Sequence, residues 1–322
     1  MRRPGRLVLV LLAATLPLAA CGGDNKSDEA GGTTTTAASM PKFEAGTTMA
    51  KLQQKGKIVV GTKFNQLGSG LKNPVTGKLE GFDIEIAKLL AAGIFGGKAE
   101  DMGDKIEFKE TISGVREAVI QNGEVDMVVA TYTINDTRKT QVDFAGPYVI
   151  DGQTVMVKSD NSTIKALADL NGKKVCTGRG STTPANLQKL QITPSEVVLR
   201  DTYPECADEL RQGRVDAEVT DRGILLGLAS SSNGAFKLVG IDVSKEPLGI
   251  GLKKGDDAFR DFLNTRLEQI EKSGEWAKAY AATLGKLGLA TPEPPPVDRY
   301  PSTGTATSLA TTTTTAATTT TS

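Results

Sequence analysis

The chain has 322 residues, and its 38 lysines and arginines are matched by 38 aspartates and glutamates. The sequence shows no basic patch, so we expect no nucleic-acid partner. It contains no histidine, which excludes histidine-based acid–base catalysis, histidine-dependent triads and histidine metal ligands.

The N-terminus has the pattern of a secretion signal. Basic residues 1–6 precede an apolar run, residues 7–19, that is shorter than the roughly 20 residues of a membrane span. Residues 18–21 (LAAC) resemble the lipobox of bacterial lipoproteins, in which the cysteine becomes the lipidated first residue. We therefore expect residues 1–20 to be a lipoprotein signal peptide and Cys21 to anchor the protein at the extracellular face of the cytoplasmic membrane. The alternative is an uncleaved or conventionally cleaved signal with an incidental cysteine.

The next segment, residues 21–45, is rich in Gly, Ser, Thr and charge, which predicts a flexible tether. At the other end, residues 291–322 are dominated by Pro and Thr and predict a disordered tail. About 240 residues, roughly 46–290, remain for the globular part, which fits one large domain or two smaller ones.

Within the globular part, short β-rich runs alternate with segments whose apolar residues recur at helical spacing. This alternation predicts βαβ units and a largely parallel sheet. We expect strands at 56–63, 105–111, 125–131, 173–178, 195–203 and 215–221, and helices at 82–95, 114–123, 182–191 and 204–213.

An internal similarity lies inside this pattern, because residues 121–131 align with residues 211–221. Each copy is the end of a helix, a glycine stop and a strand. Two copies indicate two α/β lobes of related build. Since ligands of open parallel sheets sit beyond the carboxyl ends of the strands, we expect the strand ends Thr131 and Asp221 to face one cleft.

Two cysteines remain after Cys21, namely Cys176 and Cys206. In an exported protein an even pair suggests a disulfide. The alternative is two separate buried thiols.

An ordered set of segments carries a resemblance that covers most of residues 55–285. These segments are KIVVGTK, LEGFDIEIAKLL, GEVDMVVATYTINDTRKTQVDFAGPY, LADLNGKKVCTGRGST, GRVDAEVTD, GIGLKKGD and GEWAKAY. The chain resembles the polar amino-acid branch of the bacterial extracellular solute-binding proteins, family 3, the receptors of ABC importers. The stretch VGTKFNQLGSGLKNPVTG and the cysteine pair look most like the glutamate-binding lipoproteins of actinobacterial importers.

The resemblance implies a type II periplasmic-binding-protein-like α/β fold, with two mixed sheets flanked by helices and a ligand cleft between two lobes. Lobe 1 would comprise residues 46–150 and 246–290, and lobe 2 residues 151–245. Two crossover strands would join the lobes.

On the lobe 1 side of the cleft, Arg138 can bind an α-carboxylate through two parallel charge-assisted hydrogen bonds. The resemblance places the family's carboxylate-binding arginine at this motif position. It also implies that the segment with Thr131 and Thr133 supplies an acceptor for the ligand ammonium. The alternatives are a solvated surface arginine and ordinary strand-end threonines.

On the lobe 2 side, a glycine-rich turn enters a helix at Ser181 and Thr182, where backbone N–H groups and hydroxyls favour an anion. Asp221, at the second strand end, would pair with the ligand ammonium as the family's motif acid does. The alternatives are a plain helix N-cap at the turn and a capping aspartate for the helix after residue 221.

The residues that would select the ligand side chain are Lys63, Phe64 and Arg179. Arg138 and Asp221 alone sum to zero charge, which suits a zwitterion such as glutamine, whereas adding Lys63 suits glutamate or aspartate. Lys63 could instead face solvent, and Phe64 could belong to the core.

Together these features predict a monomeric receptor that captures a polar amino acid, with L-glutamate first and L-aspartate, glutamine or asparagine as alternatives, and delivers it to an ABC permease. We expect no cofactor, no metal and no catalysis. The competing interpretations are an amino-acid sensor that signals to a membrane regulator, a dehydratase on the same fold and a purely structural lipoprotein. A dehydratase needs a positioned general acid, and Asp83 and Glu85 lie near a helix start, where capping is the simpler role.

Overall fold

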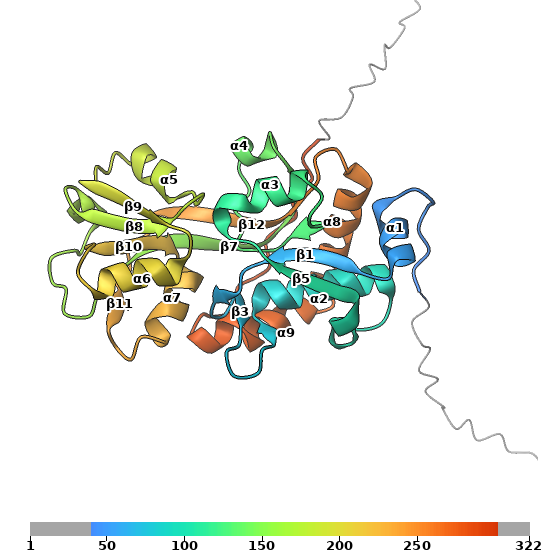
Figure 1. Ribbon diagram of the computed structural model, residues 1–322, viewed down its shortest axis with the longest axis horizontal. Coiled ribbons are helices and arrows are strands. Elements are labelled where there is room, and N and C mark those ends of the chain that lie inside the picture. The colour runs from blue at the N-terminus through green and yellow to red at the C-terminus, as the bar shows by residue number, and fades with distance from the viewer. Residues whose placement is uncertain (1–39, 302–322) are drawn as a thin grey trace, which may run out of the picture. The chain divides into compact units, whose positions relative to one another are not determined.

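A computed structural model of the protein describes residues 40–301, all of which belong to one compact unit (Figure 1). The predicted signal peptide, the lipidation site Cys21 and most of the predicted tether lie outside the described residues. Among the described helices, none is long and apolar enough to cross a membrane.

The elements of the first part of the chain alternate much as the hydrophobic pattern predicts. They are α1 (Thr48–Lys55), β1 (Ile58–Thr62), β2 (Asn65–Gln66), β3 (Gly70–Lys72), β4 (Leu79–Glu80), α2 (Phe82–Phe95), η1 (Ala99–Lys105), β5 (Ile106–Glu110), η2 (Ser113–Val115), α3 (Arg116–Gln121), β6 (Met127–Val128) and α4 (Asp136–Lys139).

The second part begins with a long strand and ends in a helical layer. Its elements are β7 (Asp143–Lys158), η3 (Leu167–Leu170), β8 (Lys174–Gly178), α5 (Thr183–Lys189), β9 (Glu196–Arg200), α6 (Tyr203–Arg211), β10 (Ala217–Asp221), α7 (Arg222–Ser230), β11 (Phe236–Leu238), β12 (Ser244–Leu252), α8 (Asp257–Lys272), α9 (Glu275–Ala282) and η4 (Leu284–Leu287).

The strand expected over residues 125–131 is shorter in the structure, because only Met127–Val128 form the β6 ladder. Thr131 has a φ of 44°, in the left-handed region where an extended strand cannot continue. The chain turns there, and the carbonyls of Thr131 and Thr133 accept from Arg116 and Arg138.

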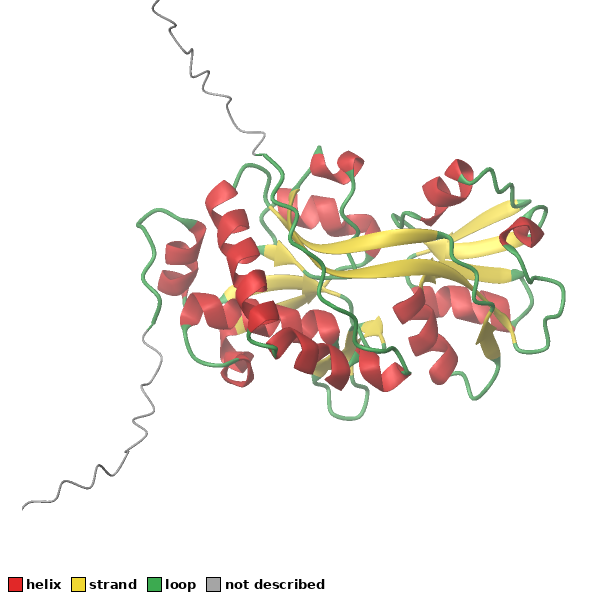
Figure 2. Cartoon of the chain, turned by 180° about the vertical axis from the view of Figure 1, so that it is seen from behind, coloured by secondary structure: helices red, strands yellow, loops and turns green. Residues whose placement is uncertain are grey.

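Two long crossover strands organise the sheet. Its order is β5-β1-β6-β12-β7-β10-β8-β9, with β11 pairing to β7. Strands β1, β5 and β6 pair in parallel at one end, and β8, β9 and β10 do so at the other. Strands β7 and β12 are antiparallel to each other and to their neighbours, and they run through both parts (Figure 2).

The predicted mixed α/β fold with flanking helices is therefore confirmed, with one refinement. The two sheets expected for the two lobes share β7 and β12, so within residues 40–301 they form one continuous nine-stranded ladder. A separate three-stranded antiparallel sheet, β2-β3-β4, lies before α2.

The buried apolar residues separate into clusters that follow the predicted lobes. Two clusters draw on residues 49–149 and 248–284, and two draw on residues 155–243. We keep the names lobe 1 (residues 46–150 and 246–290) and lobe 2 (residues 151–245) for these parts. That they move as rigid units stays a prediction.

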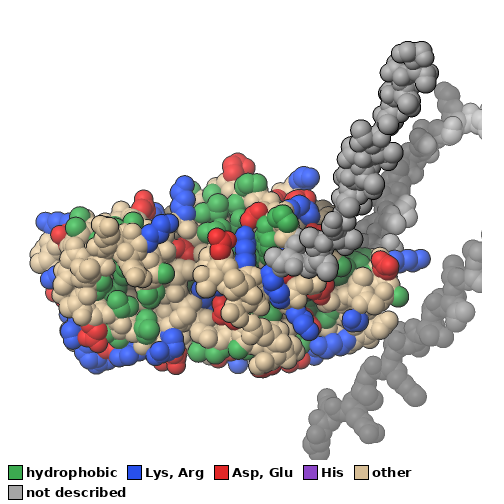
Figure 3. Space-filling model, turned by 90° about the horizontal axis from the view of Figure 1, so that it is seen from above, with side chains coloured by type: hydrophobic (Ala, Val, Ile, Leu, Met, Phe, Trp, Pro, Cys, Tyr) green, Lys and Arg blue, Asp and Glu red, His purple; other side chains and the backbone are tan. Residues whose placement is uncertain are grey.

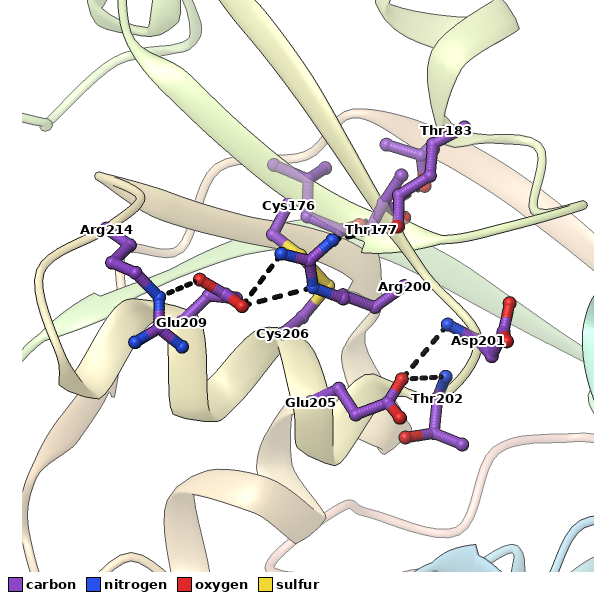
Figure 4. Close-up of a disulfide and its surroundings, with 12 residues drawn as sticks. Cys176, Thr177, Thr183, Arg200, Asp201, Thr202, Glu205, Cys206, Glu209 and Arg214 are labelled. Atoms are coloured by element: carbon purple, nitrogen blue, oxygen red, sulfur yellow. Dashed lines mark hydrogen bonds and ion pairs between the residues drawn. A yellow bond between two sulfur atoms is a disulfide. The ribbon is translucent and has the colours of Figure 1, made fainter.

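Lobe 2 contains the predicted disulfide, which joins Cys176 of β8 to Cys206 of α6 with a Cα–Cα distance of 5.5 Å (Figure 4). The two residues are separated by 30 positions in the sequence. On the chain-entropy account, closing a loop of this size stabilises the fold by about 3–4 kcal/mol. The same helix begins with a capping box, in which the Glu205 carboxylate accepts from the backbone N–H of Thr202 at 3.0 Å.

Lobe 1 is held in addition by the segment 291–301, which the sequence analysis expected to have no fold. The segment has no helix or strand, yet it packs against lobe 1. The Tyr300 hydroxyl accepts from the Phe144 N–H at 2.7 Å, and the Tyr300 ring lies 4.1 Å from Lys139 Nζ and 4.4 Å from Arg260 Cζ. Arg299 also pairs with Glu268 at 3.1 Å, and the Asp298 N–H donates to the Gly146 carbonyl at 2.8 Å, so several contacts fix a stretch whose composition alone predicts disorder.

Positive and negative side chains are interspersed over the face seen in Figure 3. This distribution follows the even overall charge of the chain.

Candidate functional site

The two lobes touch at Gly180, which lies in the turn between β8 and α5. Its carbonyl accepts from Arg138 Nη2 at 2.8 Å and from Arg116 Nη2 at 3.2 Å, and both arginines belong to lobe 1. Gly180 has a φ of 76°, and a Cβ built on it would lie 2.8 Å from the Gly114 Cα. The close approach therefore depends on glycine, and the structure shows the lobes closed on each other at this point.

Arg138 lies where the sequence motif predicts, on the short helix α4. The Asn135 side chain caps this helix by accepting from the Arg138 N–H at 2.8 Å. The Arg138 Nη1 donates to the Thr133 carbonyl at 2.7 Å, and the side chain is buried. Burial, followed by the nearby Arg116, lowers the pKa of Arg138 to about 10. The guanidinium is thus fixed and charged at neutral pH, and its outer nitrogen faces lobe 2.

A second buried arginine, Arg116, was not singled out from the sequence. Its Nη1 donates to the carbonyls of Ala130 and Thr131, each at 3.1 Å, and its guanidinium lies 4.2 Å from the Tyr132 ring centroid. A signal for it exists in the sequence, because Arg116 shares the buried face of α3 with apolar residues three and four positions later. An arginine on the apolar face of a helix indicates a buried charge with a specific partner.

The two threonines that follow β6 make hydrogen bonds through their main-chain groups. The Thr131 N–H donates to Asp83 Oδ2 at 2.9 Å, and its hydroxyl donates to Gln66 Oε1 at 3.2 Å. Thr133 forms an isolated bridge with Leu248 of β12, and its carbonyl is the acceptor for Arg138. Both threonines are buried in the wall of lobe 1 that faces Gly180.

Asp83 is not the helix cap that the sequence suggested, because the N-cap of α2 is Gly81. The buried Asp83 carboxylate accepts from the Tyr148 hydroxyl at 2.8 Å and from the Thr131 N–H at 2.9 Å. Burial raises the pKa of Asp83 to about 6, although these two hydrogen bonds and Lys63 oppose the shift. The residue fixes the strand end of β6 to the start of α2, a long-range role that local sequence does not reveal.

Lys63 follows β1 and is only 3% exposed, which rules out the solvent-facing alternative. Its Nζ donates to the Ser113 hydroxyl at 3.0 Å, and it forms no ion pair within residues 40–301. Burial, followed by Arg116, holds the pKa of Lys63 well below its usual range.

On the other side of the contact, Asp221 is 5% exposed at the end of β10. It occupies the N-cap position of α7 but makes no side-chain cap hydrogen bond. Burial, followed by the neighbouring carboxylates Asp151 and Glu246, raises the pKa of Asp221 well above its usual range, while Arg116 and the Gln153 amide oppose the shift. The three acids come from β10, β7 and β12, so the crossover strands bring them together.

Ser181 and Thr182 are both half-buried in the turn after Gly180. The Ser181 hydroxyl lies 3.1 Å from the Thr177 hydroxyl, and the Ser181 N–H donates to the Gly178 carbonyl at 3.1 Å. The Thr182 hydroxyl donates to Glu246 Oε2 and accepts from the Gln153 amide, each at 2.8 Å. The turn is thus tied to the crossover strands as well as to lobe 1.

Two predicted residues lie apart from this group. The Arg179 side chain is 58% exposed and its Nε pairs with Asp201 Oδ1 at 3.1 Å. The half-buried Phe64 has Lys72 Nζ at 5.9 Å from its ring centroid. Phe64 is also absent from the apolar clusters of the described core.

The arrangement separates charge across the contact between the lobes. Lobe 1 contributes the buried cations Lys63, Arg116 and Arg138, and lobe 2 contributes the carboxylates of Asp221 and Asp151. The carboxylate of Glu246, on the crossover strand β12, lies near these two acids. A cavity of about 20 Å³ lies between Asp83, Thr131 and Asp151, which is room for about one water molecule. This cavity is too small to hold an amino acid.

A larger groove lies elsewhere in lobe 1. It has a volume of about 690 Å³ and lies over α2, α9 and η4 of lobe 1, with Leu89, Ala279 and Leu287 in its lining. None of the buried cations or of the three acids lines it, so its size does not make it the polar site.

The sequence and the structure are both similar to those of known proteins. The sequence model of the bacterial extracellular solute-binding proteins, family 3, matches residues 58–286. The chain belongs to this family. The match contains Lys63, Arg116, Arg138 and Asp221, and it ends before the segment 291–301.

Two curated family members illustrate the range of named ligands. The glutamate-binding protein GluB of Corynebacterium glutamicum is 38% identical over 251 residues, which cover 76% of this chain and 84% of GluB. The glutamine-binding protein GlnH of an ABC transporter of Bacillus subtilis is 36% identical over 281 residues, which cover 87% of this chain and 96% of GlnH.

Solved structures support the fold. An ancestral arginine-binding protein bound to glutamine is 37% identical with a TM-score of 0.64, and the match covers 71% of this chain and 98% of that one. An ancestral amino-acid-binding protein described as a precursor of cyclohexadienyl dehydratase is 31% identical with a TM-score of 0.63, and the match covers 74% and 99% of the two chains.

Proposed function

We propose that this protein captures a polar amino acid between its two lobes and delivers it to the permease of an ABC importer. L-glutamate is the first expected ligand, ahead of L-aspartate, glutamine and asparagine. The observation that carries the proposal is the charge separation across the contact between the lobes, with Arg138 on one side and Asp221 on the other. An amino acid carries the complementary pair, one carboxylate and one ammonium, and burying either without a partner is costly.

In this proposal Arg138 binds the α-carboxylate, which replaces the Gly180 carbonyl as the acceptor of its outer nitrogen. Asp221 binds the ammonium, together with main-chain acceptors of the segment from Thr131 to Thr133. Ser181 and Thr182 close over the ligand from the turn of lobe 2. Each lobe holds half of the ligand, so ligand binding favours the closed form through that difference in affinity.

Lys63 is the residue that we assign to the ligand side chain, because a carboxylate there would give this buried amine the partner that it lacks among the described residues. Phe64 and Arg179 would have to move to reach the same ligand, since Arg179 is exposed and paired with Asp201. We therefore expect them at the rim of the cleft rather than in contact with the α-carbon groups.

We further propose that the protein works as a monomer, without cofactor or metal, tethered through a lipid on Cys21 at the extracellular face of the cytoplasmic membrane. The closed form would dock on the permease. A role in signalling to a membrane regulator uses the same closed form, and deletion of the permease would separate the two, since only transport would then fail.

The test is titration calorimetry on the chain from residue 22 onward, freed of bound ligand by unfolding and refolding with the disulfide intact. We expect L-glutamate to bind with a Kd of about 1 μM or lower, which is about −8 kcal/mol, and glutamine at least about tenfold more weakly. Tighter binding of glutamine would keep the amino-acid site and refute the assignment of Lys63. No binding of any of the four amino acids would refute the proposal.

We propose no catalytic activity, although one structural neighbour is described as a precursor of a dehydratase. The acid nearest in sequence to Asp221, Glu218, pairs in register with Cys176 and Met156 in the core of lobe 2, so it is not available as a general acid in the cleft. Turnover of a cyclic amino-acid substrate by the purified protein would overturn this.

A further inference from the structure

Lys63 is a buried amine that has no carboxylate partner among the described residues. Its Nζ donates to the Ser113 hydroxyl of η2 at 3.0 Å, and the side chain is 3% exposed. A lysine in such a position is expected to have a carboxylate partner, because an unpaired buried ammonium is costly. The described residues provide no ion pair for it.

The charged groups that face Lys63 come from four neighbouring elements. They are Arg116 of α3, Arg138 of α4, Asp83 of α2 and Glu110 at the end of β5. The two arginines disfavour a third positive charge. Of the two acids, Asp83 is already bonded to the Tyr148 hydroxyl and the Thr131 N–H, and Glu110 is exposed. Burial and Arg116 together hold the pKa of Lys63 well below its usual range.

The same wall carries a second buried donor group, the side-chain amide of Gln66 of β2, and this residue is 2% exposed. Its amide oxygen accepts from the Thr131 hydroxyl, and within residues 40–301 its buried Nε2 has no acceptor. An amide nitrogen in this position suits an oxygen of the ligand side chain, and both a carboxylate and a carboxamide carry such an oxygen. Gln66 therefore serves either ligand, which leaves Lys63 to distinguish between them.

The contact to Ser113 allows Lys63 to be either charged or neutral. A hydroxyl is both donor and acceptor, so Ser113 can accept from the ammonium or donate to the neutral amine. A neutral amine has a lone pair that can accept from the N–H of a carboxamide, whereas the ammonium has only donors and suits a carboxylate. Both states of Lys63 are thus compatible with the surrounding hydrogen bonds.

We propose that Lys63 takes up a proton from solvent when an acidic amino acid binds and stays neutral when the corresponding amide binds. This inference rests on the proposed function. It makes pH the factor that sets the choice between the two ligand classes, because the proton belongs to the complex with the acid only.

The expected effect has a definite sign. Where the empty protein holds Lys63 neutral and the complex holds it charged, affinity for L-glutamate falls by about tenfold for each unit of rising pH. Affinity for L-glutamine stays level over the same range. The preference for glutamate therefore weakens as the solution becomes more alkaline.

The experiment is titration calorimetry of the chain from residue 22 onward with L-glutamate and with L-glutamine, from about pH 6 to about pH 9. At each pH the titration is repeated in phosphate and in Tris, whose ionisation enthalpies differ. The dependence of the measured enthalpy on the buffer gives the number of protons taken up. We expect close to one proton for glutamate in the upper part of the range and close to none for glutamine.

Three variants separate Lys63 from other titrating groups, and thermal unfolding checks that each is folded. Lys63→Arg keeps a permanent positive charge and should retain the glutamate preference without proton uptake. Lys63→Met keeps a side chain of similar length and should lose both the preference and the uptake. Lys57→Met, a change at an exposed lysine beside β1, should behave as the unaltered protein.

The inference fails if glutamate binds without proton uptake throughout the range, or if the uptake persists in Lys63→Met. It also fails if the ratio of glutamate to glutamine affinity is independent of pH. Failure of both amino acids to bind would instead overturn the proposed function, and this inference with it.

Discussion

The two sides of the lobe contact carry opposite charges that are stabilised in different ways. The lobe 1 cations Arg116 and Arg138 are held by backbone carbonyls, four of which accept from them within residues 40–301 apart from the Gly180 contact. Of the acids opposite, Asp221 has its pKa raised by burial and by the neighbouring Asp151 and Glu246. The cations are therefore fixed by hydrogen bonds in spite of their own repulsion, whereas Asp221 lies beside like charges whose repulsion a bound ammonium would relieve.

This difference teaches that the two sides should respond differently to mutation. Removing Arg138 removes a fixed ligand contact and its hydrogen bond to the Thr133 carbonyl, and it also relieves repulsion with Arg116 and Lys63. Removing a carboxylate on the other side weakens ligand binding and at the same time stabilises the ligand-free protein.

The largest effect is expected for Arg138→Met. The variant loses the group that binds the α-carboxylate, so the Kd for glutamate should rise by at least about 100-fold, which is about 2.7 kcal/mol. Titration calorimetry checks this, with Arg211→Met as the matched control, because that arginine is exposed in the last turn of α6. A smaller change in Arg138→Met than in the control would contradict the assignment.

Asp221→Asn should produce two opposite changes. Affinity for the amino acid should fall by about ten- to 100-fold because the ammonium loses its charged partner. The ligand-free protein should become more stable at neutral pH. The folded-state pKa of Asp221 lies above the unfolded value, so its ionisation costs stability as pH rises from the unfolded pKa through the folded one.

Thermal unfolding of the ligand-free and ligand-saturated forms separates these changes. Asp201→Asn, a change at an exposed acid of lobe 2, is the control. A ligand-free form that is less stable at neutral pH than the unaltered protein would show that the repulsion among the three acids is not the dominant influence.

A substitution at Glu218 tests how a buried acid in the core of lobe 2 affects the pH dependence of stability. It is fully buried, and neither carboxylate oxygen has a hydrogen-bond partner within the described residues. Burial raises its pKa well above the usual value, so the folded state favours the protonated acid. Stability should fall by about 1.4 kcal/mol per pH unit between the unfolded and the folded pKa.

Glu218→Gln should therefore flatten the loss of stability as pH rises above the unfolded pKa of the glutamate, and leave glutamate affinity unchanged. Urea unfolding at a series of pH values measures this, and Glu196→Gln, at an exposed position of β9, is the control. A parallel pH profile in both variants would mean that another group causes the slope.

The smallest expected effect is that of Tyr300→Phe in the segment 291–301. The change removes the hydroxyl that accepts from Phe144 and keeps an aromatic ring between Lys139 and Arg260. We expect a loss of about 1 kcal/mol in the free energy of unfolding. Urea unfolding measures it, and a chain ending at residue 290 should lose more, because it also loses the packing of the segment.

The two lobes are also stabilised by different additional contacts. Lobe 2 has the Cys176–Cys206 disulfide inside its core, whereas lobe 1 has the segment 291–301 along its surface. Stability of the truncated chain equal to that of the longer one would show that the contacts of Tyr300 contribute nothing to lobe 1.

The fold, the family and the disulfide could be predicted from the sequence. The alternation of strand and helix patterns predicts the α/β fold, because local periodicity decides which face of each element is apolar. The ordered motifs identify the family, and the cysteine pair predicts the disulfide. The position of Asp221 at the end of β10 follows from the same patterns, because ligands of open parallel sheets lie beyond the carboxyl ends of the strands.

The rest depends on pairs of residues that are far apart in the chain. Lys63 meets Ser113 across 50 positions, and Asp83 meets Thr131 across 48. No local pattern predicts such contacts, and the same is true of the burial of Arg116 and the exposure of Arg179. The sequence by itself determined the elements, the family and the charged residues at strand ends. Only the tertiary structure decided which charges are buried together, because burial and electrostatic pairing arise from the packing of distant elements.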